Sequence, residues 1–276
     1  MSGRLARHFL AAVLSAVLAS CQAATTVHEV RSPYSHIQVV DDGPRRALIF
    51  IGSSRLEAVE TLIDLREPHR LQHPYARTMM AGLIYSPDAS ASLLVGLGGG
   101  ALVRFLNHHY SQMSLDVVEI DPVVVSVSRE FFGIEAGPRT RIFTEDGLLY
   151  LQRTRERYDL IFMNAHLHPG RGTDSAGMPL HLQEIEFLRS LHARLRPGGV
   201  VMFNMIGSED TAAYIRNIRA AFPAVDVFRP AGSGNVIVMG AVTRPDAAAL
   251  RERARALDRR GGFGFSFERL LDERGR

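Results

Sequence analysis

The chain contains no lysine, no tryptophan and a single cysteine, and each scarcity excludes a class of chemistry. Without lysine it can form no lysine Schiff base with a carbonyl substrate. It also lacks the lysine with which a P-loop contacts phosphates. The single cysteine, Cys21, excludes intrachain disulfides, cysteine-rich zinc sites and dithiol redox chemistry. These absences narrow the chemistry mainly to carboxylates, histidines, tyrosines and backbone amides.

The 276 residues are 46% hydrophobic and 22% charged, which is typical of a soluble globular chain with one large domain or one domain and a small partner. Arginine is densest in residues 244–276, where acidic residues are interleaved with it. We therefore predict a helical, solvent-facing, arginine-rich tail over residues 244–276. A nucleic-acid surface would need one-sided arginine with stacking aromatics, so no nucleic-acid partner is expected.

The first 21 residues have the pattern of an export signal. Arg4 and Arg7 precede the apolar run Phe9–Ala19, whose 11 residues are too few for a bilayer span of about 20. Leu18-Ala-Ser-Cys21 resembles the bacterial lipobox, which implies acylation of Cys21 and a membrane-anchored lipoprotein facing the periplasm. The alternatives are a plain signal peptide, or an N-terminal helix or misassigned start that would leave the protein cytoplasmic. Residues 22–27 are predicted as a polar tether.

The remaining chain divides into two predicted domains. Residues 28–85 contain β-rich runs at 37–40 and 47–51 joined by a Gly-Pro turn, followed by a linking helix over 71–84. In residues 86–243 strands and helices alternate, which predicts an α/β fold with a parallel sheet covered on both faces. The strands are predicted at 92–95, 116–120, 141–143, 158–163 and 200–204, the helices at 101–109, 122–132, 147–152, 183–195 and 211–221, and a closing antiparallel pair at 225–229 and 235–242.

Two features of the second domain indicate a nucleotide-type ligand. Gly96-Leu-Gly-Gly-Gly100 joins a strand to a helix, where Gly96, Gly98 and Gly100 could let a ligand approach the backbone or could merely form a tight turn. Glu119 ends the next strand, where a carboxylate can accept both hydroxyls of a ribose. Together they favour a nucleoside-containing cofactor.

Asp146 and Gly147 follow the third strand at the same edge of the sheet. There Asp146 can accept the adenine amino group, which favours an adenosylmethionine binder over a dinucleotide binder. An aspartate that caps the following helix is an equally good explanation, and the two roles can coexist.

The order of several motifs resembles the spermidine synthase (polyamine aminopropyltransferase) family. The motifs are the glycine loop, Val118-Glu-Ile-Asp-Pro122, Glu145-Asp-Gly147, Tyr158-Asp-Leu-Ile161 and Arg196-Pro-Gly-Gly199, preceded by Ser32-Pro-Tyr34. The resemblance runs from about His28 to Val242. It implies a small N-terminal β-hairpin domain on a seven-stranded, Rossmann-like methyltransferase fold. It also implies S-adenosylmethionine or its decarboxylated form as the co-substrate, with Tyr34 and Tyr75 on the substrate side.

The chain departs from that family where the chemistry is expected. Gly99 replaces the aspartate of the glycine loop that holds the amino group of the cofactor tail, and the neighbours of the two tyrosines are Ser35 and Ala76 instead of glutamines. Two family aspartates after the fourth strand are replaced in Asn164-Ala-His-Leu-His168. An amine acceptor has a pKa near ~10 and must lose a proton before it attacks. Asn164 cannot take that proton.

Candidate replacements for the missing aspartates lie nearby in the sequence. His166 or His168 could act as the base, because imidazole titrates near ~6.5. Asp174 could supply one carboxylate from the glycine-rich stretch 170–177, which reads either as a mobile lid or as a plain solvent loop. His166, His168 and His181 also invite a metal interpretation. Histidines are frequent throughout the chain, so we do not favour a metal site.

Three functions remain as hypotheses. The first is aminopropyl transfer from decarboxylated S-adenosylmethionine to a small amine, as in polyamine biosynthesis. The second is methyl transfer from S-adenosylmethionine. The third is a non-catalytic exported lipoprotein that retains the fold, which the absent aspartates and the lack of an evident cofactor supply outside the cytoplasm would explain. A homodimer is a candidate assembly, and the acceptor is not defined by the sequence.

Overall fold

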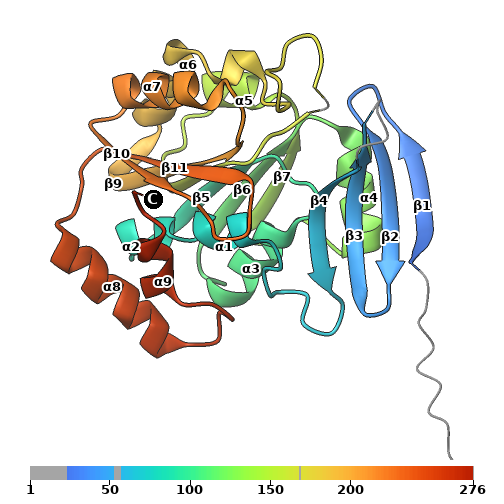
Figure 1. Cartoon of the computed structure of the whole chain (residues 1–276), viewed down its shortest axis with the longest axis horizontal. Coiled ribbons are helices and arrows are strands. Elements are labelled where there is room, and N and C mark those ends of the chain that lie inside the picture. Colours follow the sequence, from blue (N-terminus) through green and yellow to red (C-terminus); the bar gives the residue numbers. More distant parts are fainter. Residues whose placement is uncertain (1–23, 53–56, 168, 276) are drawn as a thin grey trace, which may run out of the picture.

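The computed structural model describes residues 24–52, 57–167 and 169–275 and contains two β-sheets (Figure 1). The predicted signal segment, Cys21 and His168 lie outside these residues, so the predictions that rest on them stay predictions. Within the described part, no helix combines the length and the apolar character needed to cross a membrane.

The N-terminal domain is an antiparallel sheet of four strands in the order β1-β2-β3-β4. Two of these strands form the predicted hairpin: Asp42 pairs with Arg45, and Gly43 turns the chain with a φ of 56°. The other two strands extend the hairpin on either side. The strands are β1 (Thr25–Arg31), β2 (His36–Asp42), β3 (Arg45–Ile51) and β4 (Glu57–Asp64).

The second sheet has seven strands in the order β10-β11-β9-β8-β5-β6-β7. Strands β5 to β9 are parallel, and β10 and β11 close the sheet with antiparallel pairings. Chain order reverses between the neighbouring strands β5 and β8, and ligands of open α/β sheets bind at the carboxyl ends of such strands. The strands are β5 (Ala91–Val95), β6 (Ser114–Glu119), β7 (Thr140–Thr144), β8 (Tyr158–Met163), β9 (Leu195–Ile206), β10 (Ala224–Phe228) and β11 (Asn235–Ala241).

Helices cover both faces of this sheet, as predicted (Figure 1). One face packs against three helices, around Leu188, Tyr214 and Ile218. These are α5 (Gly147–Arg153), α6 (Ile185–Ala193) and α7 (Thr211–Ala221), with the 3-10 helix η1 (Leu180–Leu182) before α6. The opposite face packs against α1 (Pro74–Met79), α2 (Gly82–Tyr85), α3 (Ala101–His109), α4 (Pro122–Phe132), α8 (Ala247–Arg260) and α9 (Phe267–Asp272).

The segment predicted as one linking helix forms two short helices that pack on the large sheet. The backbone of Met80 ends α1, and α2 starts two residues later, after Ala81. Met79, Met80 and Leu83 are fully or almost fully buried in the core that the large sheet and its helices share. This segment therefore belongs structurally with the second domain and not with the β domain that precedes it in the chain.

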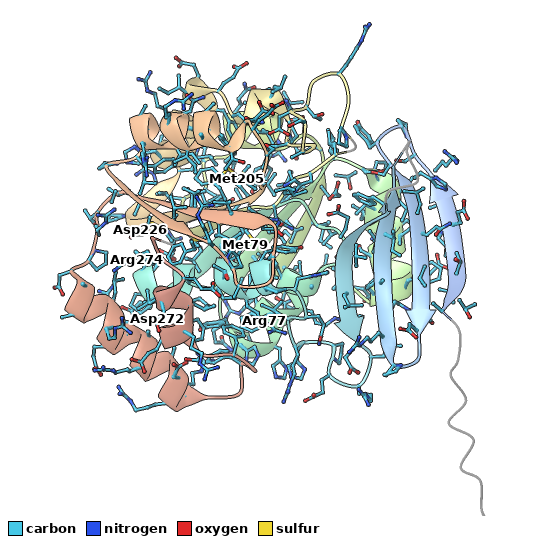
Figure 2. The ribbon with its side chains drawn as sticks, in the orientation of Figure 1. Arg77, Met79, Met205, Asp226, Asp272 and Arg274 are labelled. Carbon is cyan, nitrogen blue, oxygen red and sulfur yellow. The ribbon has the colours of Figure 1, made fainter. Side chains whose placement is uncertain are left out.

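The arginine-rich C-terminal segment is helical, as predicted, but it is packed and not merely solvated. Phe263, Phe267 and Leu270 are buried in the main core. The chain then returns to the edge of the sheet, where Arg274 lies 3.7 Å from Asp226 on β10 (Figure 2). This segment therefore contributes to the stability of the whole fold.

Packing of this C-terminal segment leads to a prediction about acid stability. His109 lies against Phe105 and Phe263, with ring centroids 4.5 and 4.8 Å apart. Burial, with His108, His69 and Arg260 nearby, lowers the pKa of His109 to about 4. In the unfolded chain a histidine has a pKa near ~6.5. Between this pH and the lower pKa of the folded state, the unfolded state therefore binds a proton that the folded state does not bind. Stability from this residue is therefore complete above pH ~6.5 and falls as the pH drops toward 4.

The measurement is urea unfolding between pH 7.5 and 4.5 for the wild type and His109→Phe, which retains an aromatic ring but cannot be protonated. We expect the wild type to lose stability more steeply over this range than the variant. Equal slopes for the two proteins would contradict a role for His109 in the pH dependence.

Candidate adenosyl and acceptor site

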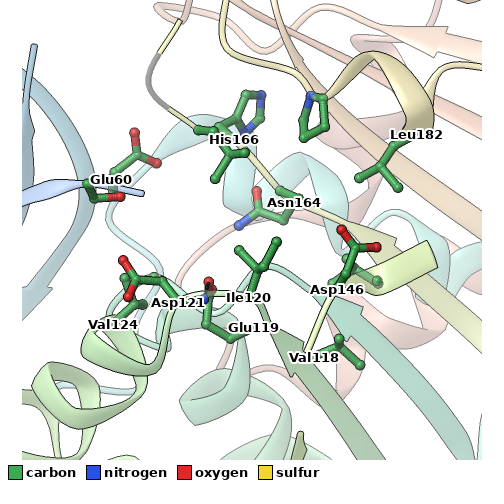
Figure 3. A pocket seen from close by; sticks show the side chains of 18 of the residues that line it. Glu60, Val118, Glu119, Ile120, Asp121, Val124, Asp146, Asn164, His166 and Leu182 are labelled. Carbon is green, nitrogen blue, oxygen red and sulfur yellow. Dashed lines mark hydrogen bonds between the residues drawn. The ribbon is translucent and has the colours of Figure 1, made fainter. Parts of the chain in front are cut away.

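A cavity of about 720 Å³, open to solvent, lies at the carboxyl ends of β5, β6 and β8. Residues from both domains line it, and Figure 3 shows Glu60 of β4 and Asp146 on opposite sides with Asn164 between them. Seven of the predicted site residues line this cavity: Gly96, Gly98, Glu119, Asp146, Gly147, Asn164 and His166.

The glycine loop is shaped by close contacts to neighbouring backbone and side chains. Gly96 has a φ of 93°, and a Cβ there would lie 2.4 Å from the carbonyl oxygen of Asn164. Gly100, which is predicted to contact the cofactor, is not among the cavity-lining residues; it precedes α3 with a φ of 73°, and a Cβ there would lie 2.4 Å from Ile134. Close packing against Ile134 therefore explains why position 100 is a glycine, without any contact to a ligand.

Gly99, where the family resemblance leads one to expect an aspartate, has little room for a side chain. Its Cβ would lie 2.9 Å from Cγ2 of Thr61 and 3.1 Å from Phe132. Its N–H donates to Oγ1 of Thr61 at 2.9 Å. Thr61 of β4 thus orients the glycine loop from the N-terminal sheet, and the position of the missing aspartate is filled by this contact.

Glu119 is held rigidly at the end of β6. Its carboxylate oxygens accept from the N–H groups of Leu97, at 2.8 Å, and Asp121, at 3.0 Å. Burial raises the pKa of Glu119, while these two hydrogen bonds favour its charged form. Each carboxylate oxygen has a second lone pair, so the group can still accept hydroxyl donors from the cavity.

Asp121 links this carboxylate to the N-terminal domain. Its side chain caps α4 by accepting from the N–H of Val123 at 2.9 Å and also accepts from the hydroxyl of Ser32 at 2.5 Å. Ser32 in turn accepts from the N–H groups of Tyr34 and Ser35. Ser35 lines the cavity and Tyr34 does not, so the Ser32-Pro-Tyr34 motif is used here to fix the chain beside Asp121.

Asp146 both lines the cavity and caps α5, as the two compatible readings of the sequence allow. Its Oδ1 accepts from the N–H of Leu148 at 2.7 Å. Its Oδ2 lies 3.4 Å from Nε2 of His181, which also lines the cavity. Gly147 is required by packing, because a Cβ would lie 2.7 Å from Val95.

Asn164 is oriented by a chain of side-chain amides. Its Oδ1 accepts from Nδ2 of Asn204 at 2.9 Å, and Oδ1 of Asn204 accepts from Nδ2 of Asn235 at the same distance. The side chain of Asn164 also bonds to the Tyr75 hydroxyl. Tyr75 lines a smaller cavity that shares Asn164 with the main one, so it lies next to the main site without lining it.

His166 and Asp174 differ in their access to the cavity. The Nε2 atom of His166 is buried without a partner among the described residues, and burial lowers its pKa to about 4. Asp174 does not line the cavity: its carboxylate accepts from the N–H groups of Ala176 and Met178 and from the Gln183 amide. Asp174 therefore organises its loop and does not itself line the cavity.

Glu60 is a candidate that sequence reasoning missed. It lies on β4, a strand the sequence analysis did not predict, and its carboxylate lines the cavity. Burial and the charge of Glu119 raise its pKa to about 7. Within the described residues no group of three or more His, Cys, Asp or Glu side chains is arranged to hold a metal ion.

The two-domain architecture and this cavity define a Rossmann-like protein of the methyltransferase fold with an N-terminal β-sheet domain. Residues 73–228 match the spermine/spermidine synthase domain, and the chain belongs to that family. The predicted fold class is confirmed.

Individual relatives agree with this assignment. A polyamine aminopropyltransferase of Vibrio vulnificus is 30% identical over 243 residues, which are 84% of this chain and 78% of the relative. Human methyltransferase-like protein 13, solved with SAH, superposes with a TM-score of 0.64 at 28% identity over 70% of this chain and 96% of its own. A spermidine synthase solved with the transition-state analogue AdoDATO has a TM-score of 0.68 at 17% identity, covering 90% and 84%. These relatives give no support to the hypothesis that the protein is non-catalytic.

Proposed function

We propose that the protein transfers an aminopropyl group from decarboxylated S-adenosylmethionine to a small amine acceptor. The main observation in favour of aminopropyl transfer is the negative charge of the cavity lining. Five carboxylates line it, and none of the described lining residues is an arginine. The carboxylates are those of Glu60, Glu119, Asp121, Glu145 and Asp146. Such a site favours a cationic sulfonium and a cationic amine over ligands that carry their own negative charge.

The residues present fit an adenosyl group. Glu119 offers its remaining lone pairs to the ribose hydroxyls, and Asp146 offers its carboxylate to the adenine amino group. The sulfonium supplies an electrophilic carbon, so the chain itself needs to orient the acceptor, remove its proton and exclude water. The aminopropyltransferase relatives support the choice of acceptor class.

Methyl transfer is the second candidate, because Gly99 replaces the loop aspartate and a methyltransferase is among the similar structures. The tail of intact S-adenosylmethionine carries a carboxylate, however, and this would join five others with no arginine of the described lining to balance it. We therefore rank methyl transfer below aminopropyl transfer.

Calorimetry and product analysis separate the two. We expect the purified protein to bind decarboxylated S-adenosylmethionine at least tenfold more tightly than the intact form. With putrescine it should release methylthioadenosine and an aminopropylated amine. Tighter binding of the intact form, or methylated product in its presence, would replace this proposal with methyl transfer. Absence of binding to either sulfonium and to methylthioadenosine would overturn both.

A further inference from the structure

We propose that Glu60 of the N-terminal sheet binds the ammonium group of the acceptor and takes its proton. This inference rests on the proposed transfer to an amine and specifies the residue that replaces the two absent aspartates. The acceptor is accordingly a primary amine that arrives positively charged. The acceptor side of the cavity would then be built by β4 and not by the loop after β8 alone.

Two hydrogen bonds, one at Glu60 and one at the next residue, fix the position of Glu60. The hydroxyl of Tyr75 donates to the Glu60 carbonyl oxygen at 3.2 Å. The adjacent Thr61 accepts from the glycine loop at 2.9 Å. Figure 3 shows the Glu60 side chain extending from the N-terminal sheet toward the cavity, across from Asn164. These two hydrogen bonds anchor β4 to Tyr75 and to the glycine loop. The strand is therefore a rigid support for the carboxylate.

Glu60 differs from the other carboxylates of the cavity because none of the described hydrogen bonds or ion pairs engages its side chain. The other four are already committed to partners. These partners are the N–H groups of Leu97 and Asp121 for Glu119, Ser32 and the N–H of Val123 for Asp121, Arg153 for Glu145, and the N–H of Leu148 for Asp146. Glu60 is thus the lining carboxylate that has its full accepting capacity available for a cation.

His166 complements Glu60 as a neutral group. Its buried Nε2 atom has no described partner. Because its pKa is lowered to about 4, His166 is neutral at pH 7 and is a poor proton acceptor from an amine. The proton therefore goes to Glu60, whose pKa is raised to about 7.

The acceptor ammonium gives one proton to the Glu60 carboxylate and becomes a neutral amine. The nitrogen lone pair forms a bond to the propyl carbon attached to sulfur, and the carbon–sulfur electron pair returns to sulfur. The products are a secondary ammonium and neutral methylthioadenosine, and Glu60 releases its proton to solvent as the products leave.

The test compares the wild type, Glu60→Gln, Glu60→Asp and the control Asp42→Asn, which removes an exposed carboxylate from the same sheet outside the cavity. Calorimetry measures binding of methylthioadenosine and then of putrescine to the loaded protein. Kinetics measure transfer from pH 6 to 10. We expect Glu60→Gln to retain methylthioadenosine binding within about threefold while kcat/KM for putrescine falls at least ~100-fold. Glu60→Asp should retain part of the activity.

The pH profile provides a second readout. The wild type should gain activity as Glu60 loses its proton near pH 7, and Glu60→Gln should lack this limb. Equal putrescine binding and equal transfer in wild type and Glu60→Gln would overturn the assignment, while the proposed function would stand. Failure of putrescine to bind the loaded wild type would also overturn it. Putrescine binding that depends on Glu60, but without aminopropylated product, would overturn the proposed function and retain Glu60 as an amine-binding residue.

Discussion

Gly96→Ala is expected to lower the free energy of unfolding by roughly 3 kcal/mol and to abolish binding of methylthioadenosine. A Cβ at this position would lie 2.4 Å from the carbonyl oxygen of Asn164 and 2.9 Å from Cα of Ala165. These are backbone atoms, so no side chain can rotate away to make room. Its φ of 93° adds strain that any L-residue would carry. The ends of β5 and β8 must therefore separate, and this is the edge of the sheet at which the adenosyl group is proposed to bind.

Thermal unfolding and calorimetry check this prediction, with Gly262→Ala as the matched control. Gly262 has a φ of 83°, close to that of Gly96, but no atom lies within 4 Å of its Cβ position. The control therefore reports the cost of the backbone angle alone, about 1–2 kcal/mol. If Gly96→Ala costs no more than Gly262→Ala and still binds methylthioadenosine, the close approach of the two strands does not control the site.

Much of the second domain could be predicted because its helices have strong local boundaries. Asp121 caps α4, Pro122 occupies its first position, and Gly133 ends it with a φ of 61°, so the predicted range agrees with the structure. The observed bounds of α3 and α7 also agree with the predicted ranges. Glu119 could be placed at the cavity because the end of a parallel strand lies at a defined edge of the sheet.

The acceptor side could not be found in this way. Glu60 and Thr61 lie on β4, whose sequence mixes acidic, apolar and hydroxyl residues without the clean alternation of a half-buried strand. Their roles arise from contact between the two domains, as in the hydrogen bond from Gly99 to Thr61. A local sequence pattern cannot predict a contact between residues that lie far apart in the chain. Distance along the chain likewise made Asp174 a candidate, although its loop occupies its carboxylate with its own backbone.

In the C-terminal segment the many charged residues draw attention away from the apolar residues that follow them. Its arginines and acidic residues predict an exposed helix, and α8 does bury only Leu250 and Ala254. The apolar residues that follow, Phe263, Phe267 and Leu271, recur every four residues, which is a helical spacing, and all three are buried. The density of charged residues around them favours the prediction of an exposed tail. Burial here depends on the side of the sheet to which the chain returns, and the topology decides this.

Glu119→Gln is expected to weaken binding of methylthioadenosine at least ~100-fold. Both oxygens of the carboxylate accept backbone N–H groups, from Leu97 and from Asp121. A glutamine amide has one oxygen, so its NH₂ group must face one of these two donors. The variant thus loses the charge offered to the ribose hydroxyls and gains a buried donor that faces another donor. Hydrogen bonds to charged groups contribute about 1.5–3 kcal/mol each, which accounts for the expected loss in affinity.

The same substitution should lower the free energy of unfolding by about 1–3 kcal/mol, because one buried N–H group loses its acceptor. Glu130→Gln on α4 is the matched control, since Glu130 is exposed and does not line the cavity. Calorimetry below the unfolding transition of Glu119→Gln, with circular dichroism to verify folding, separates lost binding from lost structure. Affinity within threefold of the wild type would place the ribose elsewhere in the cavity. Loss of affinity in a folded Glu119→Gln, with Glu130→Gln unchanged, would instead tie adenosyl recognition to the rigid carboxylate at the end of β6. Glu60 would then remain the lining carboxylate that is free to meet the acceptor.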